Sequence, residues 1–195
     1  MIKNIILDIG GIILDDSSNN LSKVYGKDMK EISMKIYRGG FEKCLLGKLS
    51  MTEFSDSFTD DDDYQYIKEI LNPTNQSIMN PLMKDNFEYI CTLKDKGYHL
   101  YLLSNLTKET YDYLSSTIDI DSYFDGAIFS YKVGLMKPNK EIFKLIIEKY
   151  NLNLDETIFF DDRERNVIAS NEVGLKAILF RSIEDIRKEL NDEIK

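Results

Sequence analysis

Cysteine, histidine and long apolar segments are all scarce in this sequence. Its two cysteines, Cys44 and Cys91, stand far apart and form no paired motif. Isolated thiols without a secretory signal peptide indicate reduced cysteines, so we expect a cytoplasmic protein. The only histidine, His99, lies at the start of a predicted strand and is interpreted as structural. No apolar run approaches the roughly 20 residues that cross a bilayer, which argues against a membrane protein.

Basic residues are also in deficit. Lysine and arginine number 25 against 34 aspartate and glutamate residues, which gives a formal net charge of −9. Binding to nucleic acid or to an anionic membrane needs a basic face, so neither partner is expected. A metal cation could neutralise part of the acidic excess locally. The 195 residues, 43% of them hydrophobic, suffice for one ordinary domain or for a core with a small insert.

What the sequence does contain is a regular alternation of strand-like and helix-like segments. Short apolar runs predict five strands, around residues 2–7, 99–105, 126–130, 157–162 and 176–180. The first run lacks polar alternation, as in a strand that is buried on both faces of a parallel sheet. Helical patterns separate these runs, and that order predicts right-handed βαβ units. We therefore predict an α/β fold with a parallel sheet.

The segment between the first and second strands differs, because it has no convincing strand-like run. Asp28–Glu31 and Ser50–Glu53 both have the capping-box pattern that marks the start of a helix. We interpret residues 15–80 as a small all-helical cap, inserted after the first strand into a core of residues 1–14 and 81–195. Asn80-Pro81 predicts the start of the next helix, and Pro138 predicts the start of a later one.

Polar side chains stand where the predicted strands end. They are Asp8 before Gly10 and Gly11, Ser104 with Asn105, Lys137 beyond the third strand, and the pair Asp161 and Asp162. Taken alone, Asp8 could be only a turn residue. The carboxyl ends of parallel strands share one edge of the sheet, so these groups should converge in one crevice. Lys137 precedes a predicted helix N-terminus, where the dipole disfavours a cation, and this position favours anion binding.

Such a set of groups is suited to phosphoryl transfer. Carboxylates together with a backbone carbonyl form an oxygen site that suits Mg²⁺. A carboxylate can also attack phosphorus and form an acyl phosphate. The phosphoryl group is anionic, so Mg²⁺ and Lys137 would supply the opposing charge, while Ser104 would donate a hydrogen bond. The residues are therefore consistent with a reaction through an aspartyl phosphate.

Four short motifs resemble those of the haloacid dehalogenase superfamily. In chain order they are Asp8-Ile9-Gly10-Gly11, Leu103-Ser104-Asn105, Gly134-Leu135-Met136-Lys137-Pro138 with Ile142-Phe143, and Phe159-Phe160-Asp161-Asp162 with Asn166 and Gly174. The resemblance covers the predicted core and implies a Rossmann-like fold with a helical cap after the first motif. The first and fourth motifs are similar to those of bacterial sugar-phosphate phosphatases such as α-D-glucose-1-phosphate phosphatase.

The resemblance implies a role for each of these groups. Asp8 is the implied nucleophile, Lys137 and Ser104 grip the phosphoryl group, and Gly11 and Asn105 line its site. Mg²⁺ would be held by Asp8, the Gly10 carbonyl and Asp162, with Asp161 and Asn166 in support. The implied activity is magnesium-dependent hydrolysis of a small phosphorylated metabolite, with sugar phosphates among the possibilities. We expect a monomer or a weak homodimer.

Gly10 departs from the family pattern. Most phosphatases of the superfamily carry a second aspartate at this position, as general acid and base, and such a group contributes about 10²–10⁴-fold. Leaving groups that need little protonation could still depart, or Asp15 or Asp16 could stand in. Otherwise the protein is a slow enzyme or none. Two alternatives therefore stay open beside the phosphatase: a metal-free dehalogenase-type hydrolase, and a non-catalytic protein that binds phosphate esters.

Overall fold

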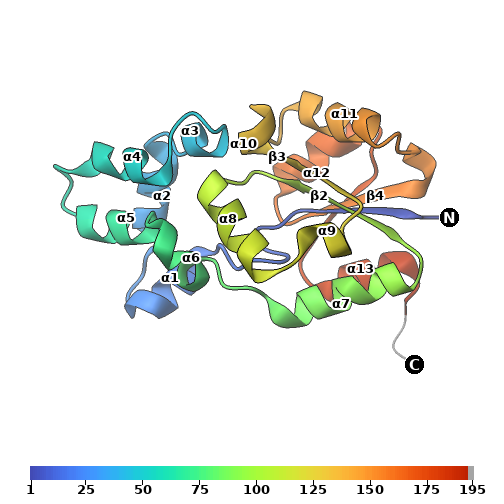
Figure 1. The fold of residues 1–195 in the computed structure, drawn as a ribbon, viewed down its shortest axis with the longest axis horizontal. Coiled ribbons are helices and arrows are strands. Elements are labelled where there is room, and N and C mark those ends of the chain that lie inside the picture. The colour runs from blue at the N-terminus through green and yellow to red at the C-terminus, as the bar shows by residue number, and fades with distance from the viewer. Residues whose placement is uncertain (193–195) are drawn as a thin grey trace.

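A computed structural model describes residues 1–192 and has one parallel sheet flanked by helices (Figure 1). The sheet has the strand order β3-β2-β1-β4-β5, and every neighbouring pair is parallel. The strands are β1 (Asn4–Leu7), β2 (His99–Ser104), β3 (Gly126–Phe129), β4 (Thr157–Asp161) and β5 (Ala177–Leu179). The predicted α/β fold is confirmed, and all five strands lie within the predicted runs.

Strand β1 lies in the middle of the sheet, and its register determines which groups meet at the carboxyl edge. Leu7 is paired with Leu102 on one side and with Phe160 on the other. Asp8 follows Leu7, and its N–H donates to the Phe160 carbonyl at 3.0 Å. The ends of β1, β2 and β4 are therefore level with one another, so the residues that follow them lie side by side.

Both faces of the sheet are covered, as the apolar runs predicted. Ile5 and Leu7 pack on one face with residues of α7 (Lys84–Asp95) and α13 (Ile183–Leu190). Ile6 packs on the opposite face with residues of α11 (Lys140–Lys149) and α12 (Glu164–Asn171). The remaining core helices are α8 (Lys108–Thr117), α9 (Ile120–Tyr123), α10 (Ser130–Val133) and the short 3-10 turn η3 (Leu154–Glu156).

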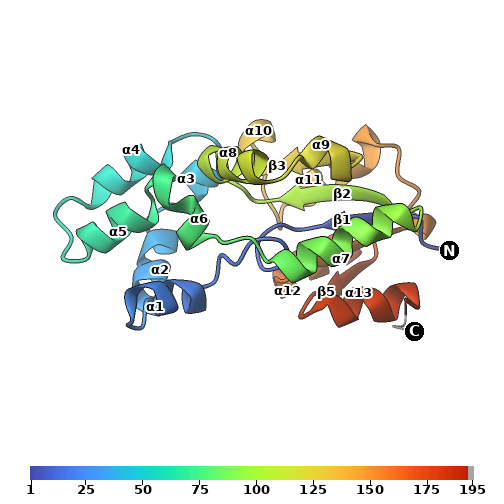
Figure 2. The same ribbon diagram turned by 60° about the horizontal axis from the view of Figure 1, so that its bottom comes forward.

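The chain between β1 and α7 is helical and has a hydrophobic core of its own. Its elements are α1 (Ser18–Tyr25), α2 (Lys30–Arg38), α3 (Glu42–Leu45), α4 (Met51–Ser55), η1 (Asp56–Phe58), α5 (Tyr64–Ile70), η2 (Pro73–Asn75) and α6 (Gln76–Met79). Ser50 and Glu53 form the predicted capping box at the start of α4. Met29, Phe54 and Ile67 are buried in a cluster that is separate from the two sheet clusters. These helices gather at one end of the molecule, beyond the carboxyl edge of the sheet (Figures 1 and 2).

Two chain connections join the helical segment to the sheet, and they are hydrogen-bonded to each other. The Asp15 N–H donates to the Pro81 carbonyl at 3.0 Å, and the Met83 N–H donates to the Ile13 carbonyl at 2.8 Å. The prediction of a helix starting at Pro81 is wrong, because residues 81–83 form this pairing and α7 begins at Lys84. We propose these paired connections as the boundary between the core of residues 1–14 and 81–195 and the cap of residues 15–80.

The helical segment also contacts the core directly. The Ser130 hydroxyl donates to the Leu45 carbonyl at 2.5 Å, and the Met51 N–H donates to the Glu109 carboxylate at 2.8 Å. The Thr110 hydroxyl at the start of α8 donates to Gln76 at 2.9 Å. These contacts place the helices against the edge at which Asp8 lies. Within residues 1–192, no helix is both long enough and apolar enough to cross a membrane.

Candidate active site

Asp8 lies at the carboxyl end of β1, where it is almost fully buried beside an ammonium group. Its residue exposure is 7%, and Lys137 is completely buried. The Lys137 Nζ lies 2.9 Å from Asp8 Oδ2 and 2.6 Å from Asp161 Oδ2. Ser104 ends β2, on the opposite side of β1 from Asp161, and is also buried. The structure therefore brings together three of the predicted groups around Asp8.

The loop that carries Lys137 is held by Asn105. The Asn105 Nδ2 donates to the Lys137 carbonyl, and the Lys137 N–H donates to Asn105 Oδ1, both at 2.8 Å. The Lys137 ammonium also donates to the Leu103 carbonyl at 2.7 Å. Pro138 does not open the helix as predicted, because α11 begins at Lys140 with Asn139 as its N-cap. The buried carboxylates of Asp8 and Asp161, rather than a helix terminus, account for the position of Lys137.

Asp161 is hydrogen-bonded on both of its oxygens. Beyond Lys137, it accepts from the Arg163 N–H at 2.8 Å and from Asn166 Nδ2 at 2.9 and 3.0 Å. The Asn166 Oδ1 is buried and has no hydrogen-bond partner among the described residues. Asp161 is thus engaged by protein donors, among them the Lys137 ammonium.

Asp162 completes a group of three carboxylates. One oxygen from each of Asp8, Asp161 and Asp162 lies within 4.8 Å of the other two, a spacing that a single metal ion can bridge. Asp162 is half-buried, and its carboxylate pairs with the Arg163 Nε at 3.0 Å. Carboxylate oxygens are the ligands that Mg²⁺ prefers. The donor set, together with the unpartnered Asn166 oxygen, fits a hard divalent cation.

The electrostatics of the site show an excess of negative charge. Burial raises the pKa of Asp8 to about 7; Asp161 acts in the same direction, while Lys137 and Ser104 oppose it. Burial also raises the pKa of Asp162, with Arg163 acting against it. Burial alone would lower the pKa of Lys137, but Asp8 and Asp161 raise it above its ordinary value. A divalent cation would relieve the repulsion between these carboxylates.

The two glycines after Asp8 let two carboxylates approach the backbone. Gly11 has φ +69°, and a Cβ on it would lie 2.9 Å from the Asp162 carboxyl carbon. A Cβ on Gly10 would lie 2.6 Å from Asp16 Oδ2. Asp15, by contrast, accepts hydrogen bonds from the N–H and the hydroxyl of Ser17, at 3.2 and 2.5 Å. Of the two acids weighed for this region, the structure brings Asp16 to Gly10.

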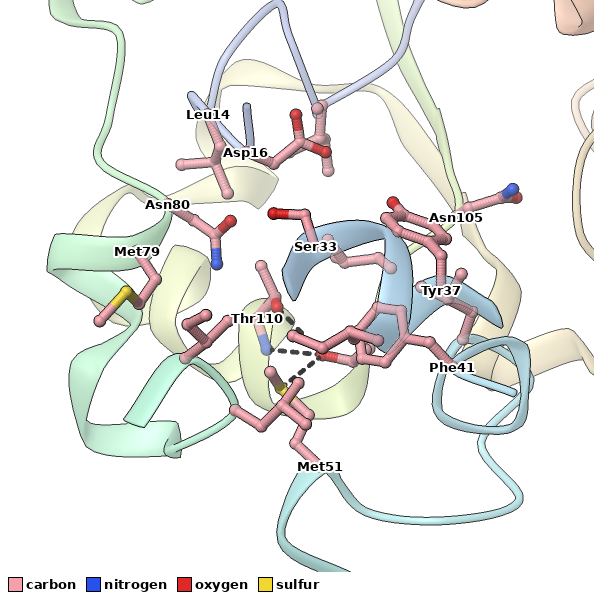
Figure 3. A pocket seen from close by; sticks show the side chains of 18 of the residues that line it. Leu14, Asp16, Ser33, Tyr37, Phe41, Met51, Met79, Asn80, Asn105 and Thr110 are labelled. Carbon is pink, nitrogen blue, oxygen red and sulfur yellow. Dashed lines mark hydrogen bonds between the residues drawn. The ribbon is translucent and has the colours of Figure 1, made fainter. Parts of the chain in front are cut away.

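A cavity opens beside this loop, between the sheet edge and the helical segment (Figure 3). Ile9, Gly10 and Asn105 form its core side, and residues of α2, α3 and α6 are among those that close it. The polar ends of Asp16, Ser33 and Asn80 lie toward one end, while Phe41 and Met51 lie toward the other (Figure 3). Asp16 is open to solvent on one side. The protein around it still removes enough water to raise the pKa of its carboxyl to about 6.

This geometry agrees with the result of comparing the sequence with known families. Residues 2–174 match the family of haloacid dehalogenase-like hydrolases. The chain belongs to this family. Its parallel sheet with flanking helices is thus the fold of a haloacid dehalogenase-like hydrolase.

Several relatives of this hydrolase are named as phosphatases. A D-ribitol-5-phosphate phosphatase of Bacteroides thetaiotaomicron is 29% identical over 97% of both chains. A phosphorylated carbohydrates phosphatase of Thermotoga maritima is 23% identical over 89% of this chain and 82% of its own. A crystal structure of an enzyme of the same family from B. thetaiotaomicron, in complex with magnesium and inorganic phosphate, superposes with TM-score 0.67. It is 22% identical and covers 93% of this chain and 95% of its own, which shows that the fold is shared.

Most of the groups predicted from the sequence lie together in the structure, and one neighbouring side chain, Arg163, is not among those predictions. The predicted groups at the ends of β1, β2 and β4 all lie at one edge, together with Lys137 and Asn166. The sequence offers Asp15 and Asp16 equally as replacements for the missing acid. Arg163 directly follows the two strand-end acids, and a cation at that place is the signal that could have found it.

Proposed function

We propose that this hydrolase is a magnesium-dependent phosphatase of small phosphorylated metabolites, with phosphates of sugars and sugar alcohols as the first candidates. The observation that carries the proposal is the contact of the Lys137 ammonium with both Asp8 and Asp161, beside Asp162. A carboxylate nucleophile, a buried cation and a further carboxylate close enough to share a metal are what transfer of a phosphoryl dianion to an aspartate requires.

In the proposed reaction, an Asp8 oxygen attacks phosphorus and displaces the alcohol oxygen. The Ile9 N–H donates to Asp8 Oδ1 at 2.7 Å and so fixes the carboxylate, which leaves Oδ2 facing Lys137. Lys137 and the Ser104 hydroxyl hold the phosphoryl oxygens. Water then attacks the aspartyl phosphate, which releases phosphate and restores Asp8.

Asp8, the Gly10 carbonyl and Asp162 are the groups that would hold Mg²⁺, whose charge would stabilise the phosphoryl oxygens. Asp161 is a poorer ligand, since both of its oxygens already accept hydrogen bonds from the protein. Its carboxylate instead positions Lys137. This division of labour between the two adjacent acids is the one implied by the family resemblance.

The substrate class is inferred from the cavity and the relatives together. The cavity is mainly apolar, yet Ser33 and Asn80 offer polar groups to hydroxyls of a small substrate. The relatives named above act on ribitol 5-phosphate and on phosphorylated carbohydrates. A specific preference for α-D-glucose 1-phosphate stays a prediction from the sequence motifs.

The two other functions considered for this sequence receive less support. A metal-free dehalogenase would have no use for Asp162 beside Asp8 and Asp161, where the three acids repel one another without a cation. A binding protein without turnover rested on the missing side chain at Gly10, and the structure places the Asp16 carboxylate against that residue. No further observation favours either function.

We expect Mg²⁺-dependent release of inorganic phosphate from at least one compound in a panel of sugar, sugar-alcohol and acyl phosphates. Phosphate release is measured with Mg²⁺ and again after EDTA, and chloroacetate is added to the panel to detect halide release. Activity should disappear in EDTA and return with added Mg²⁺. Phosphate release that EDTA leaves unchanged would contradict the metal requirement, and halide release would favour the dehalogenase.

Replacing Gly11 by alanine should weaken Mg²⁺ binding. The new methyl group would overlap Asp162, whose carboxyl carbon lies 2.9 Å from the Cβ position, so this carboxylate must move. Gly26 is the matched control, since its φ of +65° is similar and no atom lies within 4 Å of its Cβ position. Calorimetric titration should show weaker Mg²⁺ binding only in Gly11→Ala, while both variants lose about 1 kcal/mol of stability from the strained φ. Equal Mg²⁺ affinity in the two variants would argue against Asp162 as a ligand.

A further inference from the structure

The Asp16 carboxylate occupies the space that a side chain at Gly10 would fill. Gly10 lies two residues after Asp8, and its Cβ position is 2.6 Å from Asp16 Oδ2 and 3.1 Å from Asp16 Cγ. The loop makes this approach possible by folding back on itself, since the Gly11 N–H donates to the Leu14 carbonyl at 2.8 Å. The chain therefore returns a carboxylate to the backbone of the strand end that carries Asp8.

The contents of the cavity single out the same residue. Asp16 is the only carboxylic acid among the residues that line the cavity, and no lysine, arginine or histidine lines it. Its carboxylate makes no side-chain hydrogen bond or ion pair within residues 1–192, whereas the Asp15 carboxylate is engaged by Ser17. Gly10 joins the two places, since it lies two residues after Asp8 and lines the cavity. A substrate with its phosphate against Asp8 and Lys137 would therefore extend past Gly10 into the cavity, with its bridging oxygen toward Asp16.

We propose that Asp16 is the general acid and base of this enzyme, in the place that Gly10 leaves open. The assignment rests on the proposed phosphatase function. An alcohol oxygen leaves phosphorus as a poor, strongly basic anion unless it is protonated, and a positioned acid supplies the proton. Among the cavity side chains, only a carboxyl group does this readily near neutral pH, because the others are hydroxyls, amides or apolar groups.

Asp16 gives up one proton in the first step and regains one in the second. As the Asp8 oxygen bonds to phosphorus, the bond from phosphorus to the alcohol oxygen breaks, and that oxygen takes its electron pair and the Asp16 proton. In the second step the Asp16 carboxylate takes a proton from water. The water oxygen bonds to phosphorus, and the bond to Asp8 breaks. Phosphate leaves, Asp8 is a carboxylate again, and Asp16 is again protonated.

The test compares Asp16→Asn with the wild type on two probes, D-ribitol 5-phosphate and p-nitrophenyl phosphate. Ribitol needs a proton to leave and p-nitrophenolate does not. We expect Asp16→Asn to lose about 10²–10⁴-fold in kcat/KM on ribitol 5-phosphate. On p-nitrophenyl phosphate the first step survives and the second is slowed. Stopped-flow absorbance should therefore show a burst of one nitrophenolate per enzyme before slow turnover.

Asp121→Asn serves as the charge-matched control, because Asp121 is exposed on α9, before β3 and away from the carboxyl edge. It should behave as wild type on both probes. Asp15→Asn should show no burst. Equal losses on both probes without a burst, a burst in Asp15→Asn, or unchanged activity in Asp16→Asn would each overturn the assignment. Inhibition by inorganic phosphate should stay unchanged in Asp16→Asn; its loss would show that Asp16 shapes the phosphate site instead of acting on the leaving group, and would also overturn the assignment. If the wild-type protein turns over neither probe, the proposed phosphatase function itself is contradicted, and the assignment of Asp16 is overturned with it.

Discussion

Replacing Lys137 by methionine is expected to remove both activity and much of the stability of the protein. The ammonium is completely buried and contacts Asp8 at 2.9 Å and Asp161 at 2.6 Å. Methionine keeps most of the volume but leaves two buried carboxylates without a cation. Removing one partner of a buried pair costs about 3–5 kcal/mol, which for a chain of this length lowers the Tm by roughly 6–20 °C. Thermal unfolding and phosphate release measure the two effects.

A nearby lysine and a double variant separate charge from packing. Lys140 pairs with Glu172 at 3.0 Å on the surface, and an exposed pair is worth about 1 kcal/mol or less, so Lys140→Met should be nearly neutral. Adding Asp161→Asn to Lys137→Met removes one of the stranded carboxylates and should recover part of the lost Tm, without restoring activity. If Lys137→Met melts with the wild type, the buried charge is not what holds these acids in place.

Much of this site could be predicted because parallel sheets place the ends of their strands together. Asp8 and Asp161 are more than 150 residues apart, yet each follows an apolar run that could only be a buried strand. Once the strands were assigned, the shared carboxyl edge followed from topology alone. Lys137 was expected for a different reason, its position before a helix. That helix begins at Lys140 rather than at Pro138, and the Lys137 ammonium contacts Asp8 and Asp161.

The errors arose where tertiary contacts outweigh local signals. Asn80-Pro81 has the sequence of a helix start, but residues 81–83 pair with residues 13–15 instead. The same applies to Asp15 and Asp16, which are equivalent in sequence. Their difference depends on how the loop after Gly11 folds back, which presents one carboxylate to Ser17 and the other to Gly10. No pattern of residue types encodes that choice.

Replacing Asp8 by asparagine is expected to abolish turnover while making the metal-free protein more stable. The amide cannot form an acyl phosphate, so phosphate release should fall by about 10⁴-fold or more. The neutral side chain has the same size, and it removes one of the two carboxylates that share the fully buried Lys137 ammonium, next to a third carboxylate at Asp162. Lys137 keeps Asp161 as its partner. In EDTA the Tm should therefore rise, by about 2–4 °C for each kcal/mol gained.

Loss of turnover together with a raised Tm in Asp8→Asn distinguishes a catalytic aspartate from a structural one. An aspartate kept only for its ion pair with Lys137 would lose stability when its charge is removed, because the lost ion pair would outweigh the relief of repulsion. Removing the charge of a group that is retained for chemistry, at a cost in folding free energy, raises the stability instead. Asp121→Asn again provides the neutral reference. Acid-quenched wild-type enzyme should also carry phosphate on the peptide that contains Asp8. Turnover that persists in Asp8→Asn, or phosphate found on another peptide, would place the nucleophile elsewhere.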